Sequence, residues 1–106
     1  MRYEFVLRAI SKELDRAEAK FSPMRTLFDG YGTLEEEVHE LRDSIRQANK
    51  TVPPTHLDHV TKEAIHVATM AVRFLVDVCP DYLTDKFVYQ RDFKGKWSAE
   101  EEEAAK

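Results

Sequence analysis

Acidic residues crowd one short stretch of this sequence, and a later stretch carries a glutamate and a histidine at matching spacing. Glu36, Glu37 and Glu40 fall within roughly one and a half turns of a predicted helix, and Glu63 and His66 lie on the next one. Residues three or four apart share a helix face, so Glu37 points with Glu40 and Glu63 points with His66. Gathered carboxylates repel one another unless a cation lies among them. Oxygen-rich clusters suit hard divalent ions, so the sequence predicts a Mg²⁺ site here.

Three helices are expected to position these groups. Apolar residues recur at alternating three- and four-residue spacing in three segments, a pattern typical of amphipathic helices. The segments are residues 3–21, 33–48 and 56–79. Only three glycines and four prolines occur in the chain, which favours helices over sheets. The predicted fold class is therefore all-α, a bundle of three main helices per chain.

The connector before the second predicted helix spans residues 22–32. Within it, Asp29-Gly30 predicts a turn, whereas the spacing of Met24, Leu27, Phe28 and Tyr31 would extend the following helix backwards. Thr33 followed three residues later by Glu36 predicts a capping box, in which each side chain bonds the other residue's backbone amide. In that arrangement Glu36 is occupied by the helix start and not by a metal ion.

The third predicted helix is apolar over well over half of its circumference. A surface helix in a monomer buries a stripe about 100° wide, so a wider apolar arc needs two partners. In a chain of three helices the second partner is most simply another copy, which predicts a dimeric bundle. The narrow remaining stripe carries Glu63, His66, Met70, Arg73 and Asp77. Arg73 and Asp77 are expected to form a salt bridge at i,i+4 spacing, either exposed or setting the register across a dimer interface.

Length and charge narrow the classes of partner. A chain of 106 residues predicts one domain. The net charge of −4, without a basic stripe, argues against a nucleic-acid polymer, whereas a mononucleotide carried with its Mg²⁺ is compatible. No apolar run approaches the roughly 18 residues of a membrane span. The single cysteine, Cys79, and an N-terminus unlike a signal peptide predict a cytoplasmic protein without a membrane partner.

The two acidic stretches resemble the signature of the MazG-like all-α nucleotide pyrophosphohydrolases, which include small bacterial and phage proteins. That signature is Glu-x-x-Glu on one helix and Glu-x-x-Asp on the next. Glu37-Val38-His39-Glu40 matches the first half, and Glu63-Ala64-Ile65-His66 matches the spacing of the second. His66 stands where the family has aspartate. The resemblance covers residues 1–80 as a MazG-like helical domain, and leaves 81–106 as a C-terminal extension that packs on the dimer or is partly disordered.

The resemblance implies a Mg²⁺-dependent enzyme that cleaves a nucleoside triphosphate between its α and β phosphates, giving a monophosphate and pyrophosphate. It implies four candidate catalytic residues, Glu36, Glu37, Glu40 and Glu63. Glu37, Glu40 and Glu63 would be metal ligands, and Glu36 a further ligand, a base that orients water, or only the cap partner. Arg16 and Lys20 on the first helix are candidates for phosphate binding. The implied partners are a nucleoside triphosphate and a second copy, as a homodimer or dimer of dimers.

His66 departs from the family pattern. Imidazole is a poor Mg²⁺ ligand and suits Zn²⁺, Ni²⁺ or Mn²⁺-like ions better, so His66 as a ligand predicts a shifted metal preference. It can instead contact a phosphate or a metal-bound water. Two other functions stay open: a catalytically silent helical dimer that binds a nucleotide or protein partner, and an assembly subunit whose acidic stripe is only solvated.

Overall fold

The structure is a computed structural model in which residues 2–82 are described. It contains three α-helices, α1 (Arg2–Lys20), α2 (Leu27–Ala48) and α3 (Leu57–Val78), followed by a short 3₁₀ helix, η1 (Pro80–Tyr82). No strand occurs within these residues, which confirms the all-α prediction. No helix among them combines the length and apolarity needed to cross a bilayer. Most of the predicted C-terminal extension, residues 83–106, lies outside the described residues.

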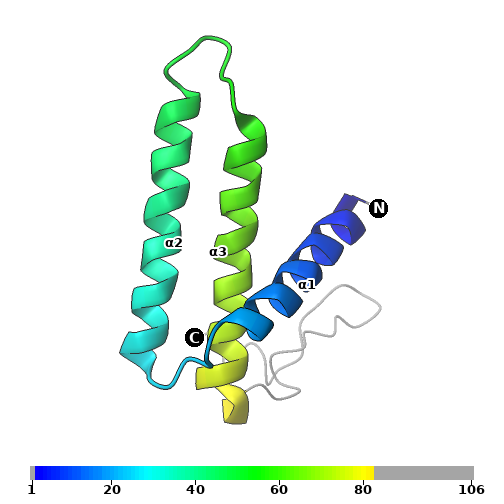
Figure 1. Cartoon of the computed structure of the whole chain (residues 1–106), viewed down its shortest axis with the longest axis vertical. Helices are drawn as coiled ribbons and strands as arrows, with labels where there is room; N and C mark the ends of the chain where they lie inside the picture. Colours follow the sequence, from blue (N-terminus) through cyan, green and yellow to red (C-terminus); the bar gives the residue numbers. More distant parts are fainter. Residues whose placement is uncertain (1, 83–106) are drawn as a thin grey trace, which may run out of the picture.

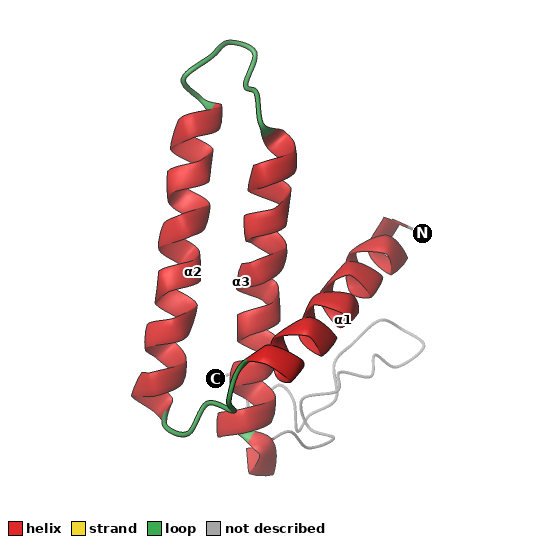
Figure 2. Ribbon diagram, in the orientation of Figure 1, coloured by secondary structure: helices red, strands yellow, loops and turns green. Residues whose placement is uncertain are grey.

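The central element of the fold is α3. It runs antiparallel to α2 in a helical hairpin, and α1 crosses it obliquely (Figure 1). The backbones of α1 and α2 each pack against α3 and not against each other (Figure 2). Within the described part of the chain, α3 therefore has two helical partners from its own chain.

The helix α2 begins at Leu27 and not at residue 33, a little under two helical turns earlier than predicted. Thr26 is the N-cap, in an extended conformation, and its side chain accepts a hydrogen bond from the amide of Asp29 at 3.0 Å. The predicted turn at Asp29-Gly30 is wrong, since both residues lie inside the helix. The predicted capping box is also wrong, because Thr33 donates to the Asp29 carbonyl at 3.1 Å as an interior helical residue. Glu36 is therefore no cap partner.

Position 30 lies inside a helix but is a glycine, because α2 approaches α3 closely at that point. A Cβ atom at position 30 would lie 2.5 Å from Cδ2 of Phe74 and 3.2 Å from the sulfur of Met24. Glycine leaves the room that this contact needs, at a cost of about 1 kcal/mol in helix propensity relative to alanine. The core around this contact comprises Ala17, Met24 and Met70, with Leu34, Phe74 and Val78 packed against them.

The polar stripe of α3 faces the interior of the bundle. Glu63 and Arg73 are 8% and 5% exposed, whereas Leu75 and Val76 on the same helix are 45% and 51% exposed. This arrangement reverses the usual one for an amphipathic helix, in which charged groups face water. A buried charged stripe needs partners inside the fold.

Arg73 and Asp77 form the predicted salt bridge at i,i+4 spacing, with a nitrogen–oxygen separation of 3.9 Å. The pair also ties the α1–α2 connector to α3. A guanidinium nitrogen of Arg73 donates to the Ser22 carbonyl at 2.7 Å, and an oxygen of Asp77 accepts from the Met24 amide at 2.9 Å. The pair is not exposed, because the chain that follows α1 folds back over this part of α3.

Candidate metal centre

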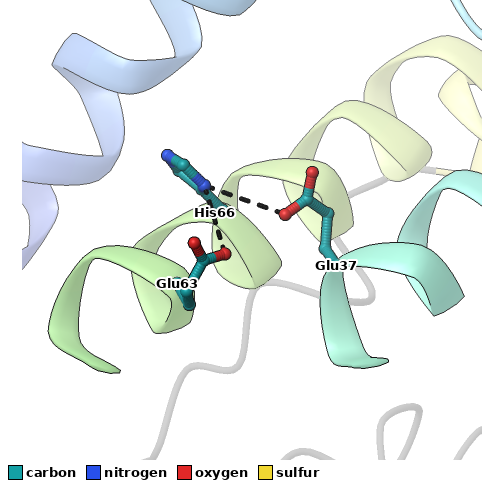
Figure 3. Close-up of side chains that lie close together, drawn as sticks. All are labelled: Glu37, Glu63 and His66. Atoms are coloured by element: carbon teal, nitrogen blue, oxygen red, sulfur yellow. Dashed lines mark ion pairs between the residues drawn. The ribbon is translucent and has the colours of Figure 1, made fainter. Parts of the chain in front are cut away.

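Side chains from α2 and α3 converge halfway along the helical hairpin. Glu37 projects from α2 toward Glu63 and His66 on α3 (Figure 3). One ligand atom from each of the three lies within 4.8 Å of the other two. Nδ1 of His66 is 3.6 Å from Oε2 of Glu63 and 3.8 Å from Oε2 of Glu37. Three of the residues predicted for the site therefore lie together.

Two carboxylate oxygens in this cluster are buried without a hydrogen-bond partner. They are Oε2 of Glu37 and Oε2 of Glu63, the same two atoms that face Nδ1 of His66. An unpaired acceptor in the interior is costly, and a charged one more so. The two oxygens therefore point to a cation as the missing partner.

The pKa of Glu37 reflects this crowding. Burial raises it most, and the neighbouring Glu40 carboxylate raises it further, while His66 acts in the opposite direction. A raised pKa means that the folded protein disfavours the charged form of Glu37. A divalent cation would remove that penalty because it compensates the charge directly.

The distances in the cluster fit a shared metal ion. Separations of 3.6 and 3.8 Å between Nδ1 of His66 and the two oxygens are too long for hydrogen bonds. Ligand atoms placed about 2.1 Å from a tetrahedral metal lie about 3.4 Å from one another. The described side chains therefore offer one nitrogen and two oxygens close to the spacing that a divalent ion requires.

Glu40 and Glu36 do not join the group of three. Both are exposed on α2. Glu40 lies close enough to Glu37 to raise the pKa of that residue. Glu36 lies with Glu37 and Arg73 along a separate cavity of about 430 Å³ beside the α1–α2 connector. Of the predicted acids, only Glu37 and Glu63 thus provide the clustered oxygens.

A groove with charges of both signs adjoins the cluster on its α1 side. It measures about 510 Å³, and His66 contributes to its wall. Its lining includes three cations, Lys12, Arg16 and Lys62, and two acids, Glu13 and Asp58. Arg16, predicted to bind phosphate, therefore lies at the groove. Lys20, the other candidate, does not line it and instead lies over the Phe21 ring, 5.3 Å from the centroid.

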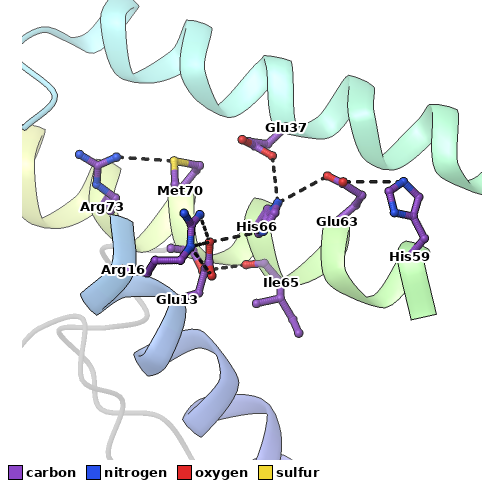
Figure 4. Close-up of polar contacts among 10 residues, drawn as sticks. Glu13, Arg16, Glu37, His59, Glu63, Ile65, His66, Met70 and Arg73 are labelled. Carbon is purple, nitrogen blue, oxygen red and sulfur yellow. Dashed lines mark hydrogen bonds and ion pairs between the residues drawn. The ribbon is translucent and has the colours of Figure 1, made fainter. Parts of the chain in front are cut away.

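Glu13 of α1 is the residue that sequence reasoning missed. Its Oε1 lies 3.3 Å from Nε2 of His66, on the opposite side of the imidazole from the cluster (Figure 4). Arg16 donates to the same carboxylate from Nε at 2.9 Å, and this hydrogen bond is the main cause of a lowered Glu13 pKa. Glu13 was not among the residues predicted for the site. The sequence signal for it was the position of Glu13 on the flank of the apolar stripe, three residues after Ile10 and four before Ala17.

Comparison of the chain with protein families, with characterised proteins and with solved structures finds no match in any of the three. The resemblance to the MazG-like pyrophosphohydrolases therefore depends on the sequence pattern alone. Fold and site together define an all-α protein of three helices with a carboxylate–histidine cluster in its interior.

Proposed function

We propose that this protein is a divalent-metal-dependent nucleoside triphosphate pyrophosphohydrolase, acting between the α and β phosphates. One observation carries the proposal: Glu37, Glu63 and His66 converge in the interior, with two buried carboxylate oxygens that lack a hydrogen-bond partner. The order of the acidic residues on successive helices, which resembles the MazG-like pattern, supplies the reaction class.

The division of polar and apolar groups on α3 supports a ligand-binding role. On this helix Glu63 and Arg73 are buried, whereas Leu75 and Val76 are about half exposed. This arrangement gives up free energy that burial of the apolar side chains would contribute. Such departures from fold-stabilising choices concentrate at functional sites. A solvated acidic face, as in a pure assembly subunit, would not bury Glu63 to 8% exposure.

The proposed roles follow from position. Glu37, Glu63 and His66 hold the ion, which when bound neutralises phosphate charge and activates water. Glu40, beside Glu37, adds negative charge that favours a divalent over a monovalent ion. Lys12, Arg16 and Lys62 of the groove bind the phosphates that extend past His66. The MazG-like resemblance implies Mg²⁺, but the nitrogen of His66 makes Mn²⁺ or another divalent ion that accepts nitrogen a better match to these ligands.

A homodimer is part of the proposal. On α2, Tyr31, Val38 and Ile45 recur at seven-residue spacing and are 54%, 44% and 41% exposed. A heptad line of apolar residues on one helix face is the pattern through which helices associate. We place the dimer contact along this face, in a protein that meets its nucleotide in the cytoplasm.

Pyrophosphate release tests the proposal directly. A panel of nucleoside and deoxynucleoside triphosphates is incubated with the full chain and Mg²⁺ or Mn²⁺. The expected result is release from at least one nucleotide, abolished by Glu63→Gln and by Glu37→Gln, and retained by the control Asp43→Asn on the exposed side of α2. Folding of each variant is checked by circular dichroism. Absence of release with every nucleotide and ion would refute the hydrolase.

A catalytically silent nucleotide-binding dimer is the second candidate. His66 favours it, because a protonated imidazole 3.6 to 3.8 Å from two carboxylates can compensate their charge without a metal. A silent binder would be stabilised thermally by nucleotide without any turnover. An assembly subunit would show neither turnover nor stabilisation.

A further inference from the structure

The imidazole of His66 lies between two sets of carboxylates. Its Nδ1 faces the cluster of Glu37 and Glu63, and its Nε2 faces Glu13 on α1 at 3.3 Å. The separation from Nε2 to Glu13 is the shortest of the three. The side chain of His66 is only 18% exposed, and those of Glu13 and Glu63 are 17% and 11% exposed. All three helices therefore meet at this ring.

A neutral imidazole carries a proton on one nitrogen and a lone pair on the other, and the partner of one nitrogen decides the state of both. Arg16 donates hydrogen bonds to both oxygens of the Glu13 carboxylate and so holds it in place beside the ring. An ionised carboxylate accepts hydrogen bonds and cannot donate them, so it favours a protonated nitrogen opposite it. Nε2 lies 3.3 Å from its carboxylate oxygen, whereas Nδ1 lies 3.6 and 3.8 Å from the other two, so Nε2 is the nitrogen that keeps the proton.

We propose that Glu13 is a positioning residue that holds the proton of His66 on Nε2, so that Nδ1 presents its lone pair to a divalent transition-metal ion shared with Glu37 and Glu63. Glu63 is more than nine-tenths buried, and its Oε2 has no hydrogen-bond partner. This buried acceptor is the independent sign that the cluster binds a ligand. Carboxylate–histidine–metal arrangements of this kind fix the ring and raise the basicity of the ligating nitrogen.

The inference names the class of ion. A nitrogen ligand that is oriented and made more basic favours Co²⁺, Zn²⁺ or Mn²⁺ over Mg²⁺, which prefers oxygen and retains its waters. The inferred metal site deepens the proposed function. It rests on that function only in assuming that the bound ion serves nucleotide hydrolysis. Metal binding by the full chain is measurable without any nucleotide, so the two ideas fail separately.

The test compares Co²⁺ affinity, read from visible absorption, in matched backgrounds. Glu13→Gln is expected to weaken Co²⁺ binding by about 10- to 100-fold, as loss of a residue that orients a ligand does. The exposed Glu18→Gln on the same helix is the control and leaves affinity unchanged. In a His66→Asp background, Glu13→Gln changes affinity by no more than about twofold, because no imidazole remains to be oriented.

A second readout uses the unaltered chain. In protein loaded with Zn²⁺ and labelled with ¹⁵N-histidine, long-range ¹H–¹⁵N spectra are expected to show His66 bound through Nδ1 and protonated on Nε2. Three results would overturn the inference. Glu13→Gln could weaken Co²⁺ binding equally in both backgrounds, it could weaken it in neither, or the spectra could show His66 protonated on Nδ1. Co²⁺ binding that depends on Glu13 as described, without pyrophosphate release from any nucleotide, would support the inference and remove the hydrolase.

Discussion

Neutralising Glu37 should stabilise the protein without metal and destabilise it with metal. In the metal-free protein Oε2 of Glu37 is a buried acceptor without a partner, and burial and Glu40 raise the pKa of the group. Glutamine keeps the shape, removes the charge and can donate from its amide toward Oε2 of Glu63. The variant Glu37→Gln therefore removes a penalty that only a cation would otherwise compensate.

The size of the effect follows from the burial of Glu37. An unsatisfied buried acceptor costs about 1–3 kcal/mol. Because the Glu37 side chain is 22% exposed, we take the lower end. A gain of about 1 kcal/mol raises the Tm of a domain of this size by about 4–8 °C. An ion at one hundred times its Kd stabilises the wild type by about 2.7 kcal/mol, and a variant lacking one ligand gains much less.

The sign of the pH dependence provides an internal check. Because the pKa of Glu37 is raised on folding, the folded protein binds this proton more tightly than the unfolded chain does. The stabilisation from Glu37 is therefore full below the ordinary glutamate pKa of about 4.3 and is lost as the pH rises through the raised value. The difference between wild type and Glu37→Gln should accordingly vanish in acid.

Differential scanning fluorimetry of the chelated and metal-loaded proteins, from acid to neutral pH, measures all three effects. The expected pattern is a higher Tm for Glu37→Gln in chelator and a higher Tm for wild type with Mn²⁺, while Asp43→Asn follows the wild type. A chelated variant that melts below the wild type at neutral pH would refute the account of Glu37 as an uncompensated buried acid.

Three further predictions concern the framework and the dimer. Gly32→Ala should raise the free energy of unfolding by about 1 kcal/mol, because alanine favours the helix and no atom lies within 4 Å of the added Cβ. Gly30→Ala should lower it by about 1 kcal/mol, because the added Cβ clashes with Phe74. Urea denaturation measures both changes. Arg73→Met should cost about 1.5–3 kcal/mol in the same assay, because its charged hydrogen bond to the connector is lost. Val38→Glu should disrupt the proposed dimer and give a monomer in sedimentation experiments, with helix content unchanged.

Periodicity was sufficient to predict three helices, because each apolar stripe repeats over many residues. It failed at the start of α2, where Asp29-Gly30 and Thr33-Glu36 both carry local signals that favour a later beginning. The contact that decides the matter joins Gly30 to Phe74, residues far apart in the chain. The helical spacing of Leu27, Phe28 and Tyr31 indicated an earlier start, but local rules alone did not decide between the two starts.

The candidate site was also predictable only as far as the spacing of residues on single helices determines it. Spacing on single helices placed Glu63 and His66 on one face, and the antiparallel hairpin brings Glu37 to them. The same spacing gave Glu37 and Glu40 one direction, yet Glu40 is exposed because α3 covers only one side of that face. The approach of Glu13 depends on the angle at which α1 crosses α3, which no spacing on α1 determines.

The attachment of α1 to α3 alone has a consequence for exchange and regulation. Because the backbone of α1 packs on α3 and not on α2, and Glu13 of α1 reaches His66, binding of an ion in the proposed metal centre would be thermodynamically linked to docking of α1. Linkage is reciprocal: an ion that tightens docking by some factor is itself bound more tightly, by the same factor, when α1 is docked. Amide hydrogen exchange along Arg2–Lys20 should therefore slow when the ion binds, and a binding partner that lifts this helix away would release the ion.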